Sequence, residues 1–391
     1  MISFARFRFV LTMAPVAGPT AAVTRLMAAV ACLMALVPCL VVLIGPAGWL
    51  HPFVAMAQEA APLPTIPDAS SIIHEIDLNV PIETVWNAFT TDEGFKALGV
   101  AKARVDLRVG GKILSHYGPD GELGDEGTIE NTILAFEPLR MIAFKISKPP
   151  KDFPFMNAYA TTWSVATLTD LGEGRTHLRF AMLGFTGDPE SQKMRAFFEQ
   201  GNAWVMQHLK QVLEGDVPEE VPMPTPDSFA AAPSDSLAPI LLDTIVNAPA
   251  AEVWKLWTTS DGMRSFLTEA NVELRIGGPF ELYFDPEAPQ GSRGSEGCVI
   301  LSYDPGHMLS FSWNAPPKFA HARTRYTWVV VYVDPYGPHQ SKVTLRHLGF
   351  AEQATVDADF AGEWAQVRAY FQRAWPMVLD ALRKHFESSE G

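Results

Sequence analysis

Nine side chains have the types that line binding sites for flat or hydrophobic small molecules: aromatic rings, one methionine and one histidine. Such sites are mostly apolar, with a few polar groups that orient the ligand. The candidates are Phe144, Phe155, Trp163, Met182, Phe311, Trp313, Tyr326, Trp328 and His347. They predict non-covalent binding of a small hydrophobic molecule, and ordinary core packing is the alternative explanation for most of them.

Groups that would support catalysis are sparse. His116 and Tyr117 are near the first candidates, and Arg325 and His347 are among the later ones. A histidine, tyrosine or arginine in an apolar cavity can polarise a carbonyl, as in a cyclase or a hydrolase. No pair of titratable groups recurs at matching places along the chain. We therefore expect no catalytic residue and keep an aromatic cyclase or hydrolase as the alternative function.

Motifs for metals, cofactors and nucleophiles are also missing. The histidines show no His-x-x-x-His spacing, which argues against a zinc site. The Gly-Gly pairs at 110–111 and 277–278 lack the Lys-Ser/Thr that follows a phosphate-binding loop, so they predict tight turns. Cys298 has no evident histidine partner, and we expect a small buried residue. The sequence predicts no metal and no cofactor.

These residues belong to a repeated pattern. "VPIETVWNAFTTDEG" at 80–94 returns as "APAAEVWKLWTTSDG" at 248–262. Three further matches follow in the same order: "RVGG" at 108–111 with "RIGG" at 275–278, "LGF" at 183–185 with 348–350, and "AWVM" at 203–206 with "AWPM" at 374–377. The chain therefore contains one domain twice, which we name copy one (71–215) and copy two (240–388). His347 replaces Met182 in this comparison, so the copies are not chemically equal.

The elements predicted for each copy define an α+β fold. A strand precedes two short helices, about six strands follow, and a long helix ends the copy; Asp188, Pro189 and Glu190 have the form of its N-terminus. Consecutive strands joined by turns pair antiparallel, so we expect a curved antiparallel sheet packed on the long helix. Residues 58–70 and 216–239 are rich in proline and predict a tether and a linker.

This order of motifs resembles the START-related helix-grip superfamily. The similarity is closest to the domain named after the C-terminal half of the activator of the heat-shock-protein-90 ATPase, and it covers both copies. The resemblance implies a sheet of six or seven strands that grips the last helix, often with an apolar cavity between them. Its members include lipid binders, aromatic cyclases and cochaperones, so the fold alone does not give the function. A protein-interaction module is therefore a third possible function.

The N-terminal segment predicts export. Arg6, Arg8 and Arg25 are the only Lys, Arg, Asp or Glu residues before Glu59, an apolar run fills 26–50, and "AMA" at 55–57 resembles a cleavage site. We predict a signal peptide at 1–57, with an uncleaved membrane anchor as the alternative, and a periplasmic or secreted body. An exported body would not meet a cytosolic chaperone. The net charge of −14 argues against nucleic-acid partners.

Two expectations concern the helices. Trp86 and Trp254 should be structural and hold the first helix on the sheet. Pro376 should bend the last helix of copy two, or make it restart at Trp375, because proline removes a backbone hydrogen bond. The six extra residues before it should lengthen the helix, so that 364–371 closes over a more enclosed cavity. On this basis we expect copy two to be the binding domain.

Overall fold

The computed structural model of the chain describes residues 71–215, 236–337 and 339–387. The predicted signal peptide, the predicted tether and residues 216–235 of the predicted linker lie outside the described residues. Within the described ranges, no helix has both the length and the hydropathy needed to cross a membrane.

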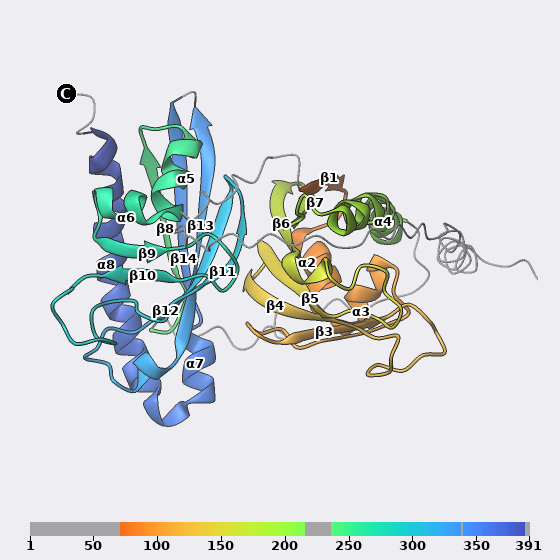
Figure 1. Cartoon of the computed structure of the whole chain (residues 1–391), viewed down its shortest axis with the longest axis horizontal. Coiled ribbons are helices and arrows are strands. Elements are labelled where there is room, and N and C mark those ends of the chain that lie inside the picture. The colour runs from red at the N-terminus through yellow and green to blue at the C-terminus, as the bar shows by residue number, and fades with distance from the viewer. Residues whose placement is uncertain (1–70, 216–235, 338, 388–391) are drawn as a thin grey trace, which may run out of the picture. The chain divides into compact units, whose positions relative to one another are not determined.

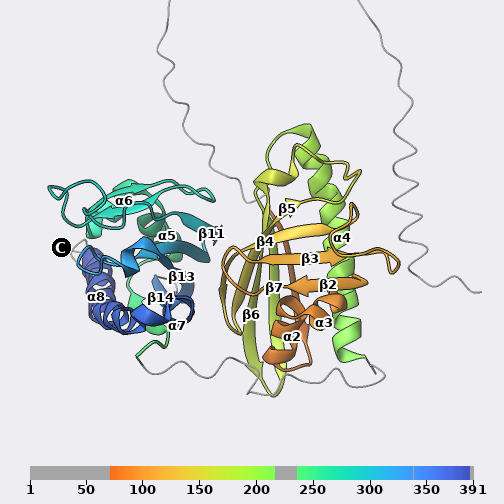
Figure 2. The same cartoon turned by 90° about the horizontal axis from the view of Figure 1, so that it is seen from below.

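Copy one is an antiparallel sheet of seven strands with a long helix beside it (Figures 1 and 2). The strand order is β1-β7-β6-β5-β4-β3-β2, because each strand from β2 to β6 pairs with the next one along the chain and β1 pairs with β7. The elements are β1 (Ile72–Leu78), α2 (Ile82–Thr90), α3 (Asp92–Phe95), η2 (Lys96–Leu98), β2 (Lys102–Val105), β3 (Lys112–His116), β4 (Ile129–Glu137), β5 (Met141–Lys148), η3 (Tyr159–Thr161), β6 (Trp163–Gly172), β7 (Arg175–Leu183) and α4 (Pro189–Glu214).

Copy two repeats this order with a divided sheet. Five strands lie in the order β11-β12-β13-β14-β8, and β10 pairs with β9 in a separate ribbon. An isolated bridge between Pro279 and Val299 links the ribbon to the segment before β11. The elements are β8 (Ile240–Val246), α5 (Ala250–Thr258), α6 (Ser260–Phe266), β9 (Glu269–Val272), β10 (Phe280–Tyr283), β11 (Ile300–Asp304), β12 (Met308–Asn314), η5 (Ala322–Thr324), β13 (Tyr326–Gly337), β14 (Gln340–Leu348), α7 (Phe350–Val356), η6 (Ala358–Phe360) and α8 (Ala361–Glu387). The predicted tandem α+β fold is confirmed.

The repeated Thr-Thr-x-x-Gly stretch forms the corner between the two short helices. The Thr90 hydroxyl donates to Trp86 O (2.8 Å), and Thr91 Oγ1 accepts from Gly94 N (3.0 Å) as the N-cap of α3. A Cβ at Gly94 would lie 2.0 Å from a backbone oxygen of α2, so only glycine fits there. The same contacts recur in copy two at Thr258, Thr259 and Gly262.

The repeated Leu-Gly-Phe also has a local cause. Gly184 and Gly349 have φ angles of 85° and 99°, in the left-handed region that favours glycine. A Cβ would meet the ring of Trp163 at 2.6 Å in copy one and the ring of Trp328 at 2.7 Å in copy two. The glycine therefore allows the chain to leave the sheet underneath a tryptophan ring.

The two long helices test the predictions made for the start of α4 and for Pro376 in α8. Asp188 caps α4 as predicted, because its side chain accepts from Glu190 N. Pro376, by contrast, lies inside a single helix, α8, which does not restart at Trp375. The extra residues of copy two do not lengthen α8, because they form α7 and η6 instead. Pro376 is exposed, so water can bond the carbonyl that the missing N–H leaves open.

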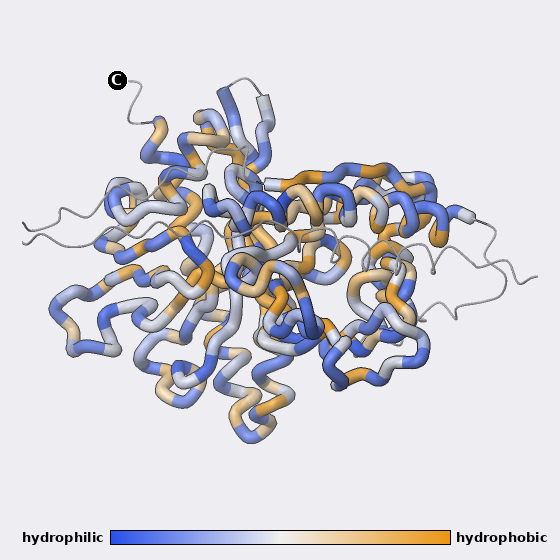
Figure 3. The backbone as a smooth tube through the Cα atoms, turned by 45° about the vertical axis from the view of Figure 1, so that its right-hand side comes forward, coloured by the Kyte–Doolittle hydropathy of each residue, from blue (hydrophilic) through white to orange (hydrophobic). Residues whose placement is uncertain are grey.

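Hydrophobic and hydrophilic residues alternate along the helices and strands of the described chain, as elements with one buried face require (Figure 3). In α8 the buried face includes Trp364, Val367 and Phe371. The segment 364–371 therefore packs into the core of copy two, and the expectation that it closes over a cavity as a lid is wrong.

Candidate functional site

Positions that face the space between sheet and helix can be matched between the copies. Met182 on β7 lies opposite Ile72 on β1, and His347 on β14 lies opposite Ile240 on β8, so Met182 and His347 correspond. Burial along α4 and α8 gives the pairs Met194/Val367, Phe198/Phe371, Asn202/Trp375, Met206/Leu379 and Leu209/Leu382. The match of "AWVM" with "AWPM" is thus two residues out of phase. Trp204, which is 44% exposed, is not the counterpart of Trp375.

Aromatic side chains fill the interior of copy two. Phe280 stacks on Phe311 with 3.9 Å between ring centroids, and Trp313 packs on Trp375 at 5.2 Å. Phe371 lies beside Trp375 at 6.1 Å. All five side chains are buried, so the predicted site residues Phe311 and Trp313 lie together in a packed core.

His347 belongs to the same core and is held by a chain of hydrogen bonds. Trp375 Nε1 donates to His347 Nδ1 (2.9 Å), so Nδ1 must be the unprotonated ring nitrogen. Nε2 then donates to Thr327 Oγ1 (2.8 Å), whose hydroxyl donates to Trp313 O (2.9 Å). Burial lowers the pKa of His347 well below 6.5. The imidazole is neutral, and neither nitrogen is available to a substrate.

The matching positions in copy one carry smaller side chains. Strand register and helix burial give the pairs Phe280/Ile113, Phe311/Phe144, Trp313/Ile146, His347/Met182, Phe371/Phe198 and Trp375/Asn202. Three of the six are reduced, because isoleucine replaces phenylalanine and tryptophan, and asparagine replaces tryptophan. Ile146, Phe198 and Asn202 are only partly buried, in contrast to their counterparts. The middle of α4 therefore covers the sheet less completely than α8 does.

A cluster of partly buried rings lies where α4 meets the β5–β6 connection. We name it the aromatic lid, and it consists of Phe153, Phe155, Tyr159, Phe197 and Phe198. The centroids of Phe153 and Phe198 are 6.3 Å apart, and those of Phe155 and Phe197 are 5.6 Å apart. Asn157 N and Nδ2 both donate to the Glu190 carboxylate at 3.0 Å and attach the connection to α4. Of the predicted site residues, Phe155 lies in this lid, and Phe144 and Met182 lie on the sheet beneath α4.

The corresponding place in copy two is an open groove. Glu363 on α8 accepts from Ala322 N (2.8 Å), which repeats the contact between Glu190 and the β5–β6 connection. Beside it lies a hollow of about 630 Å³ that is lined by Lys318, Phe319, Glu363, Gln366, Ala369 and Arg373. This hollow lies along the outer side of α8 and does not reach the buried aromatic core.

The other predicted aromatics lie elsewhere. Trp163 Nε1 donates to Tyr303 O and Trp328 Nε1 donates to Phe136 O, both at 2.8 Å, so each indole bonds a strand of the other copy. Neither ring faces the helix of its own copy. Tyr326, at the start of β13, is 43% exposed.

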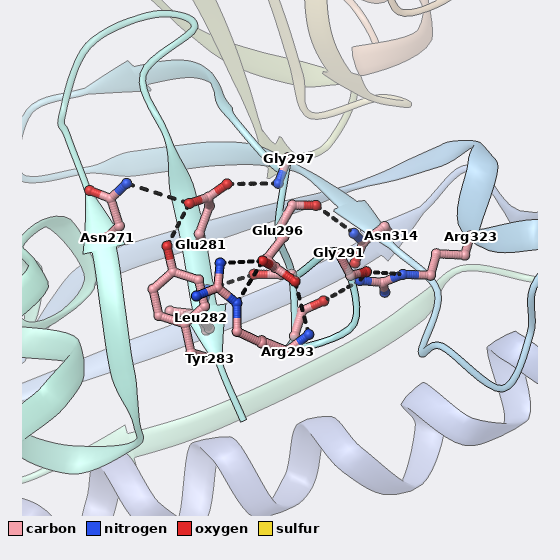
Figure 4. Close-up of polar contacts among 12 residues, drawn as sticks. Asn271, Glu281, Leu282, Tyr283, Gly291, Arg293, Glu296, Gly297, Asn314 and Arg323 are labelled. Carbon is pink, nitrogen blue, oxygen red and sulfur yellow. Dashed lines mark hydrogen bonds and ion pairs between the residues drawn. The ribbon is translucent and has the colours of Figure 1, made fainter. Parts of the chain in front are cut away.

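A polar network in copy two surrounds the long connection between β10 and β11. Glu281 accepts from Tyr283 Oη (2.7 Å) and Gly297 N (2.8 Å), while Glu296 accepts from Arg293 Nε (2.8 Å) (Figure 4). Burial and the bond to Glu281 raise the pKa of Tyr283 to about 12. These groups bond one another and the backbone of the loop, so their role is to hold the loop in place. Beside them Cys298 is buried, which raises the pKa of its thiol to about 12 and makes it a poor nucleophile.

Apart from His347, the polar candidates from the sequence, which are His116, Tyr117 and Arg325, do not face either interior. His116 Nδ1 bonds the Gly118 backbone, and its Nε2 lies 3.2 Å from Asp125 Oδ1, which fastens the β3–β4 loop. Tyr117 is half exposed. Arg325 pairs with Asp357 at 3.3 Å, next to α7. Across the described ranges, no group of three or more His, Cys, Asp or Glu side chains is placed to hold a metal ion.

Comparison with known proteins gives a family. The model of the family described as activator of Hsp90 ATPase homolog 1-like protein matches residues 79–214 and 247–387, well over half of the chain. The chain is similar in structure to the Aha1 dimer from Colwellia psychrerythraea, with 19% identity over 37% of this chain and 96% of that one and a TM-score of 0.30. An HSP90 activator from Plasmodium falciparum gives 20% identity over 37% and 93% with a TM-score of 0.29.

A two-domain structure is also similar. The di-domain ARO/CYC protein BexL from the BE-7585A biosynthetic pathway gives 13% identity over 81% of this chain and 98% of that one, with a TM-score of 0.31. The curated proteins contain no significant match.

Proposed function

The chain belongs to the family of activator of Hsp90 ATPase homolog 1-like proteins, and from this premise we propose that it is a non-catalytic binding protein whose copy one takes a small hydrophobic ligand between the sheet and α4. One observation carries the proposal: the inward positions that Phe280, Trp313 and Trp375 fill in copy two hold Ile113, Ile146 and Asn202 in copy one. This reverses the expectation that copy two is the binding domain.

The aromatic lid supports this assignment. Rings that are partly buried can rotate or separate at a lower cost than a packed core can, because they have already kept part of their contact with water. Two hydrogen bonds from Asn157 to the partly buried Glu190 attach the lid to α4. A hydrophobic ligand that separates these rings replaces their contacts with its own, and it reaches the sheet at Phe144 and Met182.

We propose a non-catalytic role because the histidine and the thiol buried in copy two are not free to act as a base or a nucleophile. His347 is neutral and bonded at both nitrogens, and Cys298 is a buried thiol of raised pKa. Non-covalent binding needs only an apolar surface and a few orienting polar groups. A protein partner, which the family name suggests, is the alternative function.

Binding of N-phenyl-1-naphthylamine, a neutral fluorescent probe, tests the proposal. We expect one site per chain on the wild-type protein. Asn202→Trp places in copy one the residue that fills copy two, and it should weaken probe binding about tenfold or more. Gln207→Trp adds the same ring at an exposed position of α4 and should leave binding unchanged.

Three results would contradict the proposal: no binding to the wild-type chain, equal binding to the wild-type chain and Asn202→Trp, or equal losses in both variants. Absence of any probe site would favour the protein-interaction function instead.

We also propose that the binding body is exported and that residues 1–57 are removed. The support is the arginine-bearing, acid-free start of the chain, followed by an apolar run and a small-x-small site. N-terminal sequencing of the protein from its native cells should begin near Gln58. A membrane-bound form that retains earlier residues would show an anchor.

A further inference from the structure

Polar groups occupy inward positions of copy one where copy two is apolar. His74 on β1 lies at the position of Leu242 on β8, because Ile72 and Ile240 correspond two residues earlier. Ser164 on β6 lies opposite Met182, as Val329 lies opposite His347. With Asn202 in place of Trp375, three inward positions change from apolar to polar. An interior that only packs hydrophobic side chains gains nothing from these polar replacements, because burying a polar group costs free energy unless it is hydrogen-bonded.

His74 has an unsatisfied nitrogen. Its Nε2 is buried and has no hydrogen-bond partner among the described residues. Burial lowers the pKa of His74, an effect that the Glu199 carboxylate partly opposes. The imidazole is therefore neutral at pH 7, and its Nε2 can carry the proton and act as a donor. A buried polar atom without a partner costs free energy that a bound ligand can return.

Asn202 is also poorly matched. Its Nδ2 donates to Met182 Sδ at 3.7 Å, and a thioether sulfur is a weak acceptor. Arg195, two turns earlier on α4, bonds Glu199 Oε2 (2.9 Å) and Ser71 O (3.3 Å) through its terminal nitrogens, whereas its buried Nε has no partner among the described residues. At the edge between β1 and α4, the donor nitrogens His74 Nε2 and Asn202 Nδ2 therefore have no oxygen acceptor. The charge of the Arg195 guanidinium is already paired with Glu199.

We propose that the ligand of copy one carries an acceptor oxygen, which lies at the edge between β1 and α4 and is hydrogen-bonded by His74 and Asn202. This inference rests on the proposed function and adds the chemical class of the ligand: a hydrophobic body with a carbonyl or carboxylate oxygen. A neutral carbonyl fits better than a carboxylate, because the Glu199 carboxylate already pairs with Arg195 at this edge (2.9 Å).

Three competitors of similar shape test the inference: 9,10-dihydroanthracene, its ketone anthrone, and 9,10-dihydroanthracene-9-carboxylate. Each displaces N-phenyl-1-naphthylamine from the wild-type chain. We expect anthrone to bind about fivefold more tightly than the hydrocarbon, the value of one hydrogen bond. His74→Leu, which installs the copy-two residue, and Asn202→Leu should each reduce this ratio of affinities toward one. Gln207→Leu, at an exposed position of the same helix, should keep the wild-type ratio.

The outcomes separate this inference from the proposed function. Equal affinities for ketone, carboxylate and hydrocarbon in the wild-type chain would overturn the acceptor oxygen while leaving hydrophobic binding intact. A preference that persists in both variants would also overturn the assignment to His74 and Asn202. A carboxylate that binds more tightly than the ketone, with a preference lost in the variants, would support the acceptor oxygen and identify an acid as its source. Failure of the fluorescent probe to bind would remove the proposed function itself.

Discussion

Replacement of Trp86 by alanine is expected to lower the free energy of unfolding by about 3–5 kcal/mol. The Trp86 side chain is 2% exposed and packs between α2 and the sheet of copy one. Its loss leaves a cavity in a region that also holds the buried Val85 and Phe89. The measurement is urea denaturation followed by far-ultraviolet circular dichroism.

Trp254, its counterpart in the sequence, provides the comparison. It is only partly buried, and the fully buried tryptophan of α5 is Trp257 instead. Trp254→Ala should therefore cost clearly less, about 1–2 kcal/mol. Equal losses of unfolding free energy in the two variants would contradict the expectation that the exposed fraction of each tryptophan sets its contribution to stability. Unchanged stability of Trp86→Ala with altered uptake of the fluorescent probe would place Trp86 in the binding site.

Acid should destabilise the protein through His347. In the unfolded chain this histidine takes up a proton below a pKa of about 6.5, whereas in the folded chain its pKa is well below that value. The unfolded state therefore binds more protons as the pH falls, and stability that is present above pH 6.5 is lost below it. Between pH 7 and pH 5 this one group should remove about 2 kcal/mol.

The variant His347→Met, which installs the residue of copy one, tests this expectation. It should be less stable at pH 7, because Trp375 Nε1 loses its acceptor and Thr327 Oγ1 loses the donor Nε2. The fall in unfolding free energy from pH 7 to pH 5 should nevertheless be about 2 kcal/mol smaller than in the wild-type chain. An unchanged fall would mean that other groups cause the acid sensitivity.

The duplicated fold could be predicted from sequence because its repeated motifs are imposed by local backbone needs. Thr91 and Gly94 recur as Thr259 and Gly262 because a helix N-cap and a close backbone approach admit few other residues. The start of α4 was predictable for a similar reason, since Asp188 caps the helix. Such positions keep their residue types whatever the interior contains.

The faces of the aromatic residues were harder to predict. Residues 163–166 of β6 and 327–333 of β13 are buried on both faces of the sheet, so the alternation that distinguishes inner from outer residues is weak there. Trp163 and Trp328 were expected to line a cavity, and they bond the other copy instead. Phe311, Trp313 and His347 face inward, but into a packed core.

The residues of the proposed site that were not predicted from the sequence are His74, Asn202 and the members of the aromatic lid other than Phe155. The spacing of buried residues along α4 and α8 aligns Asn202 with Trp375. The match of "AWVM" with "AWPM" aligned Trp204 with Trp375 instead. Identity of a few letters is a weaker guide to helix phase than the spacing of apolar residues. His74 becomes informative only once strand register pairs it with Leu242.

Under the proposed function, the aromatic lid would make ligand uptake a gated process. Asn157 bonds Glu190, and Phe155 packs on Phe197, so entry between these rings would require an internal motion that separates the β5–β6 connection from α4. The observed association rate should then rise with ligand concentration and level off at the rate of lid opening, typically on the microsecond to millisecond scale. The same motion would set the residence time of the ligand, so that a ligand with few contacts to the protein would still dissociate slowly.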